Sequence, residues 1–240
     1  MTMFEAYSDS RPPRPVENGR PKQEHERTPD LIADAGPAPS VPERARTTDR
    51  TMVGVEDWDR YHRDGRTARV LGDIEIREFY EHAKPQEGMQ ALDLGCGRGA
   101  WTRQLGRYGI RTVGYDFSPV AITAARAGGP YYGRISFVPC DLNAEGIPLT
   151  VEPGSVDIVS MRMSLEHLDR HRLMGDVRRV LAPGGLAYVM TKIMAEDPGD
   201  PLERGMSRDQ LGDLAEGWSS ATPYRVGTHS VMVLRDPVGY

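Results

Sequence analysis

Residues 89–100 carry the clearest structural signal in the chain: Met-Gln-Ala-Leu-Asp-Leu-Gly-Cys-Gly-Arg-Gly-Ala. The first half is a short apolar run, which predicts a buried strand, and three glycines follow within five residues. Because glycine allows sharp turns and close backbone approach, the strand is expected to lead through a tight loop into a helix. This order is typical of an α/β fold that binds a ligand beyond the carboxyl end of the strand.

Strands and helices are expected to alternate after this unit. Apolar runs predict further strands at residues 110–115, 135–139, 155–161 and 186–191. Helices are expected over 101–108, over 119–127 after a Ser118 cap, and from an Asp169 cap until Pro183. Such alternation implies parallel crossovers, with helices on both faces of one sheet.

The two ends of this core have signals of their own. Apolar residues at helical spacing over 67–83, among them Val70, Ile74 and Phe79, predict an entry helix that Pro85 stops. Ser207 and Gln210 form a capping box for a helix expected to reach Trp218. Two short strands, 224–226 and 230–234, follow. The predicted fold is therefore α/β, with a doubly wound, seven-stranded, mostly parallel sheet and an antiparallel C-terminal edge hairpin.

Composition divides the chain into two parts. Eight of its 19 prolines lie in the first 50 residues, and no Phe, Trp or Tyr occurs from Ser8 to Asp57. Such a stretch buries too little apolar surface to offset the entropy of ordering the chain. We therefore predict a disordered leader over 1–50 and one globular domain over 51–240, with entry or lid helices at 51–84 and the α/β core at 85–240.

Charge and cysteine content argue against several classes of protein. The formal net charge is -5, so no strong positive field attracts a phosphate backbone, and nucleic acid is not expected as a partner. No apolar run approaches the roughly 18 residues that span a bilayer, and residues 1–10 lack the apolar core of a signal peptide. Cys96 and Cys140 suggest neither a metal site nor a disulfide framework. A cytoplasmic protein without a metal is expected.

Three aspartates stand where the first three strands end. Asp93 lies two residues before the first glycine, Asp116 follows the second strand, and Asp141 follows the third. The glycine loop alone also fits the dinucleotide fingerprint, with Asp116 placed for a ribose. However, Asp93 puts a carboxylate where a pyrophosphate would be repelled. A ligand with a cationic group and no phosphate fits better, although each aspartate taken singly is also a common turn residue.

The segment Asp93-Leu-Gly-Cys-Gly-Arg-Gly99 resembles the first motif of the class I S-adenosylmethionine (SAM) dependent methyltransferases, a Rossmann-like family. Companion motifs appear in order: Asp116, then Asp141 within Pro-Cys-Asp-Leu-Asn, then Leu-Ala-Pro-Gly-Gly at 181–185. The resemblance covers the chain from about Trp58 onward and leaves the leader unmatched. It implies SAM as cofactor and methyl transfer, most simply to an oxygen or nitrogen of a small-molecule acceptor.

The resemblance also implies a role for each matching residue. Asp93 would support the cationic methionyl end of SAM, Asp116 would accept hydrogen bonds from both ribose hydroxyls, and Asp141 would receive the adenine amino group. The loop residues expected at the cofactor are Gly95, Cys96, Gly97 and Gly99. The expected apolar neighbours of adenine or of the sulfur-bearing arm are Phe117, Leu142 and Met161.

The acceptor side has fewer signals. His167, in the segment that faces the sulfonium in the family, is the best candidate for a general base, although a structural histidine, hydrogen-bonded to backbone at the start of the next helix, is the commoner explanation. Residues 58–66 resemble an aromatic N-terminal element that lies over SAM in several small-molecule methyltransferases. There Tyr61 would face the sulfonium region and Arg66 would reach the SAM carboxylate. Because Met163 stands where metal-dependent relatives carry a Glu, no metal is expected.

Other functions remain open at this level. A protein or peptide methyltransferase would use the leader as a docking arm. A SAM-binding regulator without turnover would keep the same cofactor residues. A dinucleotide oxidoreductase is disfavoured by Asp93 and Asp141.

Overall fold

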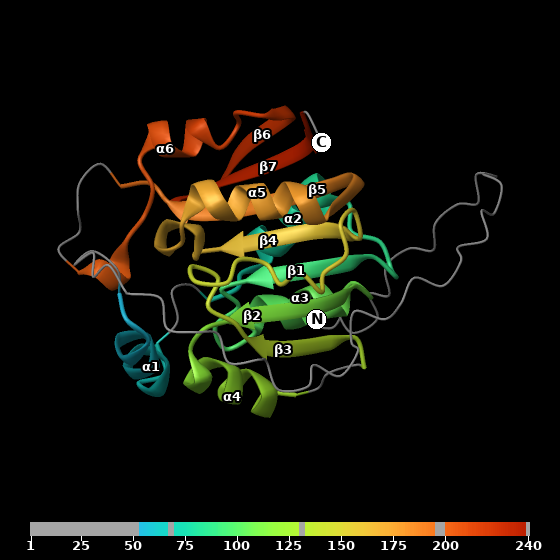
Figure 1. Cartoon of the computed structure of the whole chain (residues 1–240). Helices are drawn as coiled ribbons and strands as arrows, with labels where there is room; N and C mark the ends of the chain where they lie inside the picture. The colour runs from blue at the N-terminus through green and yellow to red at the C-terminus, as the bar shows by residue number, and fades with distance from the viewer. Residues whose placement is uncertain (1–52, 67–69, 130–132, 195–199, 239–240) are drawn as a thin grey trace, which may run out of the picture. The chain divides into compact units, whose positions relative to one another are not determined.

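The computed structural model describes residues 53–66, 70–129, 133–194 and 200–238 (Figure 1). The predicted leader over 1–50 lies outside the described residues, so its disorder stays a prediction. No helix in the described part of the chain combines the length and apolar composition needed to cross a bilayer.

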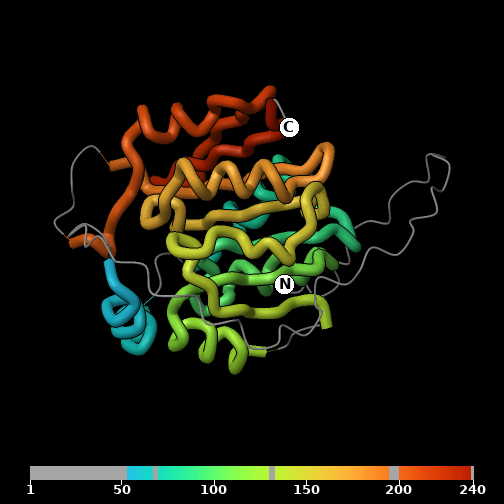
Figure 2. The backbone as a smooth tube through the Cα atoms, in the orientation of Figure 1, coloured from blue at the N-terminus to red at the C-terminus, as the bar shows by residue number. Residues whose placement is uncertain are grey.

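A seven-stranded sheet runs through the domain in the order β3-β2-β1-β4-β5-β7-β6. The strands are β1 (Gln90–Leu94), β2 (Arg111–Asp116), β3 (Ile135–Pro139), β4 (Val156–Arg162), β5 (Leu181–Lys192), β6 (Trp218–Val226) and β7 (His229–Pro237). Strands β1 to β5 pair in parallel, whereas β7 pairs antiparallel with both β5 and β6. In Figure 2 the colour goes from yellow-green at the β3 edge back to bluish green at β1, and then through yellow at β4 to red at the β6–β7 edge. The predicted topology is confirmed.

Helices cover both faces of this sheet. They are α1 (Val55–Arg63), α2 (Asp73–Ala83), α3 (Ala100–Arg107), α4 (Pro119–Ala127), α5 (Arg170–Val180) and α6 (Arg208–Asp213), with short 3-10 helices η1 (Leu165–His167) and η2 (Pro201–Glu203). In Figure 1, α5 lies in front of the sheet, α2 and α3 lie behind it, and α1 lies beyond the arrowheads. The carboxyl ends of the parallel strands therefore face α1.

Strand β1 lies inside the sheet, between β2 and β4, and its residues belong to the core. Its Leu92 pairs in register with Val113 of β2 on one side and with Val159 of β4 on the other. Because both faces of β1 are covered, Leu92 and Leu94 are fully buried. Phe79 of α2 and Trp101 of α3 pack behind the sheet in one apolar cluster with Tyr188 of β5.

The entry helix differs from its prediction. Helix α2 begins at Asp73, after an extended Gly72, and residues 67–69 of the predicted helix lie outside the described residues. Val70 and Ile74 are 77% and 58% exposed, so they do not form part of a buried stripe. The buried face instead includes Glu75, whose carboxylate binds the Arg162 guanidinium at 2.5 and 3.1 Å. This ion pair joins residues 87 positions apart, and periodicity cannot reveal it.

Two further boundaries need correction at the C-terminal side. Helix α5 ends at Val180 rather than at Pro183, because β5 already begins at Leu181 and pairs with Val156 of β4. The capping box of Ser207 and Gln210 is confirmed, but α6 ends at Asp213. Trp218 opens β6 and pairs with Pro237 of β7, so strand pairing overrides the helical spacing of its apolar residues.

Candidate functional site

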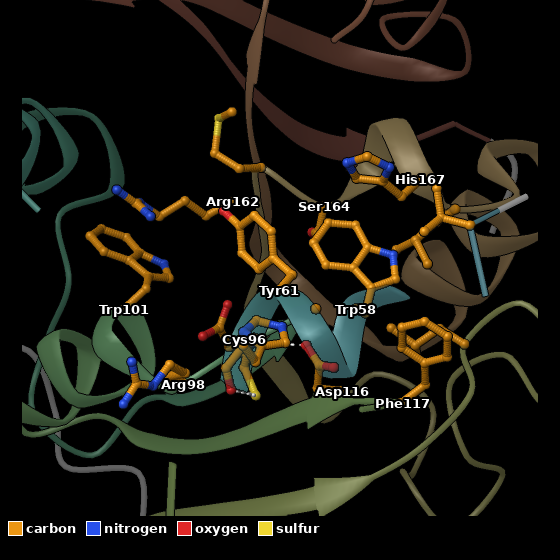
Figure 3. Close-up of a pocket in the computed structure, with 18 of the residues that line it drawn as sticks. Trp58, Tyr61, Cys96, Arg98, Trp101, Asp116, Phe117, Arg162, Ser164 and His167 are labelled. Atoms are coloured by element: carbon orange, nitrogen blue, oxygen red, sulfur yellow. Dashed lines mark hydrogen bonds between the residues drawn. The ribbon is translucent and has the colours of Figure 1, made fainter. Parts of the chain in front are cut away.

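One cavity lies at the carboxyl ends of β1, β2 and β4, and residues from α1 also line it. Figure 3 shows side chains from the glycine loop, from α1 and from the segment after β4 converging on this cavity. It lies where a parallel sheet is expected to bind its ligand. At β1 the strand order reverses, because β2 and β3 lie on one side of it and β4 and β5 on the other.

The glycine loop between β1 and α3 forms the floor of the cavity. Gly95 and Gly99 adopt φ values of +74° and +75°, which side chains other than glycine rarely tolerate. A Cβ at Gly95 would lie 2.5 Å from the Cβ of Ser164, and one at Gly99 would lie 2.4 Å from the Phe137 ring. Neighbouring side chains therefore leave no room for a side chain at Gly95 or Gly99.

Asp93 sits at the end of β1 with only 1% of its surface exposed, and it lines the cavity. Its carboxylate accepts hydrogen bonds from the Thr102 hydroxyl at 2.6 Å and the Ser160 hydroxyl at 3.0 Å. Burial raises the pKa of Asp93 to about 6, although these two hydroxyls and the nearby Arg162 oppose the shift. Since no described cation forms a salt bridge with it, Asp93 is suited to receive a cationic ligand group.

Asp116 joins the glycine loop to α4. One carboxylate oxygen accepts from the backbone N–H of Gly97 at 2.8 Å, and the other accepts from the N–H of Ser118 at 2.9 Å. Burial raises the pKa of Asp116, and these two N–H groups oppose that shift. Each oxygen keeps a lone pair for a further donor, which a pair of ligand hydroxyls would satisfy.

Asp141 closes the far end of the cavity together with Phe117 and Leu142. One of its oxygens accepts from the N–H groups of Asn143 and Ala144, at 3.0 and 3.2 Å, so this aspartate also forms a local turn. The turn role and a ligand role do not exclude each other, because the second carboxylate oxygen is not used in the turn.

Helix α1 contributes an aromatic wall. The Trp58 ring lies 5.2 Å from the Tyr61 ring, 6.0 Å from the His62 ring and 4.9 Å from the His167 ring, and all four residues line the cavity. His62 faces the glycine loop, and its Nδ1 is buried without a partner among the described residues. Burial lowers the pKa of His62, while the Asp116 carboxylate opposes this shift.

A carboxylate fastens α1 to the rest of the domain. Asp59 accepts from the Ser118 hydroxyl at 2.5 Å and from the backbone N–H of Val120 at 3.5 Å. Ser118 is also the N-cap of α4 and donates its own N–H to Asp116. The aromatic wall is thus coupled directly to the loop that carries Asp116.

Arg66 follows α1 and has two partners already. Its guanidinium lies 4.6 Å from the centre of the Tyr61 ring, and it donates to Glu203 of η2 at 3.5 Å. Glu203 also binds the Lys192 ammonium. Although Arg66 lines the cavity, its position is explained by Tyr61 and Glu203 without any ligand.

His167 reaches the cavity from η1, beside Trp58. Its Nδ1 is buried and has no hydrogen-bond partner among the described residues. Burial lowers the pKa of His167 to about 4, with Arg204 contributing, so the imidazole is neutral at pH 7 and able to accept a proton. The preceding Glu166 does not line the cavity, and burial raises its pKa to about 7.

Most of the residues expected from the sequence meet at this cavity, but two do not line it. Met161 is fully buried inside β4, whereas Met163, which follows the strand with a φ of +58°, lines the cavity. Gly99 caps α3 and packs against Phe137. The sequence interpretation missed His62, Arg98 and Trp101; their only signal was proximity to the Trp58 and glycine-loop motifs.

Comparison with known proteins agrees with this geometry. Residues 92–189 match the family model described as a methyltransferase domain. The ubiquinone biosynthesis O-methyltransferase of Xylella fastidiosa is 25% identical over 151 residues, which cover 62% of this chain and 59% of that protein. Its namesake from Rhizobium rhizogenes is 34% identical over 115 residues, covering 45% and 43%. The chain therefore spans about half the length of the curated relatives it matches.

Solved structures share the fold. A SAM-dependent methyltransferase from Aquifex aeolicus superposes with a TM-score of 0.57 at 17% identity, over 76% of this chain and 98% of that one. Phosphoethanolamine N-methyltransferase 2 of Haemonchus contortus gives 0.60 at 17% identity, over 79% and 59%. The cyclase SpnF gives 0.56 at 20% identity, over 68% and 80%. At these identities, the likeness shows the fold and not the reaction.

Proposed function

We propose that this protein transfers a methyl group from SAM to an oxygen or nitrogen of a small molecule, and the match of residues 92–189 to a methyltransferase domain supports this. One observation carries the proposal: Asp93, Asp116 and Asp141 end three adjacent strands and line one cavity with the glycine loop. SAM would supply an electrophilic methyl group, and an aligned acceptor lone pair would attack this carbon in line as the carbon–sulfur bond breaks and S-adenosylhomocysteine leaves.

The residues at the cavity fit this cofactor. Asp93 is a buried carboxylate that forms no salt bridge with any described residue, which suits the ammonium of the cofactor's amino-acid end. Asp116 offers an unused lone pair on each oxygen to the two ribose hydroxyls. Asp141, with Leu142 and Phe117, is placed to receive the adenine. Loop residues Gly95 to Gly97 allow the cofactor to approach the backbone, and Cys96 lies among them as a buried thiol.

The relatives support a small-molecule acceptor and transfer to oxygen. Both curated relatives described above are named O-methyltransferases of ubiquinone biosynthesis, although this chain covers about half of each. In the proposed reaction, neutral His167 accepts the proton of the acceptor, and Tyr61 with Trp58 shields the reacting atoms from water. If the acceptor is instead a protein or peptide, its chain would have to enter between α1 and η1, where Trp58 contacts His167.

A methyl-release assay tests the proposal directly. Full-length protein is incubated with radiolabelled SAM and either a small-molecule extract or the protein fraction of a bacterial lysate. We expect label in extractable small molecules, and none with Asp116→Ala, which loses the ribose acceptors. Label in protein instead would favour a peptide acceptor. SAM binding without turnover on either pool would favour a regulator, and binding of NAD instead of SAM would refute the proposal.

A further inference from the structure

Trp101 presents an unused hydrogen-bond donor to the cavity. The residue lies in the first turn of α3, is 3% exposed, and has an Nε1 that is buried without a partner among the described residues. Figure 3 shows the indole nitrogen on the side of the ring that faces the cavity. Because an unpaired buried N–H is costly, this position calls for an acceptor that the described protein groups do not provide.

The Trp101 ring is held rigidly for such a role. Phe79 meets it edge to face at 4.8 Å and 86°, and Tyr188 stacks on it at 5.6 Å and 20°. These contacts come from α2 and β5, so the indole is fixed from the core side while the N–H remains at the cavity. A donor held in advance loses little entropy when its acceptor arrives.

Arg98 stands three residues before Trp101 and also lines the cavity. Its guanidinium has no ion pair or side-chain hydrogen bond within the part of the chain that the structure describes. The two residues flank the start of α3, whose N-cap Gly99 has no side chain to satisfy the first N–H groups. Arg98, the first helical residue Ala100 and Trp101 thus line one cavity, and a cation, a helix N-terminus and an indole N–H all favour an anion there.

The neighbouring group has the opposite charge. Asp93 lines the same cavity, and Thr102, the residue after Trp101, donates to its carboxylate at 2.6 Å. The Asp93 carboxylate therefore lies beside the hydrogen-bond donors of Trp101 and Arg98. This arrangement is complementary to a zwitterionic ligand group in which an ammonium lies next to a carboxylate. The amino-acid end of SAM has this pattern of charge.

We propose that Trp101 Nε1–H and Arg98 bind the carboxylate of the cofactor's amino-acid end. This inference rests on the proposed function and reassigns the contact that the sequence placed on Arg66. Arg66 is held over Tyr61 and donates to Glu203, so its guanidinium already has two partners among the described residues. Trp101 and Arg98 act as binding and positioning residues, because the carboxylate fixes where the sulfonium lies along the cavity.

Calorimetry on the full-length protein with two ligands tests the inference. S-adenosylhomocysteine carries the amino-acid end, whereas 5′-methylthioadenosine lacks it. For Trp101→Phe, which removes the donor and keeps an aromatic ring, we expect about tenfold weaker binding of S-adenosylhomocysteine and 5′-methylthioadenosine binding within about twofold of wild type. Unchanged binding of S-adenosylhomocysteine, or an equal loss for both ligands, would overturn the inference.

Matched variants control for unrelated effects. Trp218→Phe removes another buried, unpartnered indole N–H that lies outside the cavity, and should leave both affinities unchanged. Arg98→Gln should weaken S-adenosylhomocysteine by about threefold, with a smaller loss at high salt, since Arg98 is exposed. Arg77→Gln, which removes an exposed arginine paired with Glu78 on α2, is its control.

A second measurement on wild-type protein covers the case in which Trp101→Phe does not fold. Decarboxylated SAM should bind at least about tenfold more weakly than SAM, and Arg98→Gln should weaken only SAM. Equal affinities for SAM and its decarboxylated form would overturn the inference. Wild-type protein that binds neither nucleoside would instead refute the proposed function, so the two failures are distinguishable.

Discussion

At the scale of single residues, Asp93 combines burial with the lack of a described salt bridge. Burial raises its pKa to about 6 in the folded protein, above the usual 3.8 of an aspartate, so the protonated form is favoured by folding. That contribution to stability is full below about pH 4 and is lost as the pH rises through 6. We expect Asp93→Asn to raise the free energy of unfolding at pH 8 by up to about 3 kcal/mol and to have little effect at pH 4. Urea unfolding at both pH values measures this; an equal effect at both would contradict it.

The same titration should control cofactor binding. An ammonium group prefers the ionised carboxylate, so affinity for S-adenosylhomocysteine should increase about tenfold from pH 5 to pH 7.5. Arg162 and Asp116 act on Asp93 in opposite directions, and neither removes the effect of burial. In Asp93→Asn, binding should be weaker and independent of pH over this range. Calorimetry at four pH values compares the two proteins, and a pH dependence that survives in the variant would assign it to another group.

His167 yields a kinetic prediction. Its neutral imidazole lies at the cavity, so His167→Ala should lower kcat by about tenfold or more while affinity for S-adenosylhomocysteine changes less than about twofold. The pH profile of kcat identifies the base: a limb near pH 4 belongs to His167, whereas one near pH 7 would belong to Glu166. If kcat with the true acceptor is unaffected, His167 is structural.

At the scale of elements, α1 depends on one carboxylate for its position. Asp59 holds the Ser118 hydroxyl, and without it Trp58, Tyr61 and His62 would have to be ordered when the ligand binds. We expect Asp59→Ala to weaken S-adenosylhomocysteine by about three- to tenfold and to speed hydrogen exchange over residues 55–63. Asp57→Ala, which breaks only an exposed pair with Arg60 on the same helix, is the matched control and should change neither.

Elements with local signals were predictable from the sequence, and those shaped by distant contacts were not. The Ser118 and Asp169 caps and the Ser207 capping box define the starts of α4, α5 and α6 through neighbouring backbone groups. In contrast, the buried face of α2 includes Glu75, which pairs with Arg162 of β4. Trp218 likewise follows helical spacing but pairs with β7.

At the scale of the whole molecule, the site also contains residues that the sequence could predict and residues that only the fold reveals. Asp93, Asp116 and Asp141 were predictable because the carboxyl ends of parallel strands meet at one edge of the sheet. Trp101 is the first residue of the helix expected over 101–108, and its ring packs in the apolar core. Its second role depends on which side of the ring carries the nitrogen, and only the fold determines that orientation.

The division of the chain into a leader over 1–50 and a domain over 51–240 is still a prediction. Deletion of the leader tests it. The described residues that line the cavity begin at Val53, and the fastening of α1 begins at Asp59. Deleting residues 1–50 should therefore leave affinity for S-adenosylhomocysteine within about twofold and the thermal midpoint within about 2 °C. Deleting residues 1–66 removes Trp58, Tyr61 and His62 as well, and should weaken binding by about tenfold or more. Scanning calorimetry and ligand titration of both forms measure this, and loss of folding in the shorter deletion would show that residues 1–50 belong to the domain.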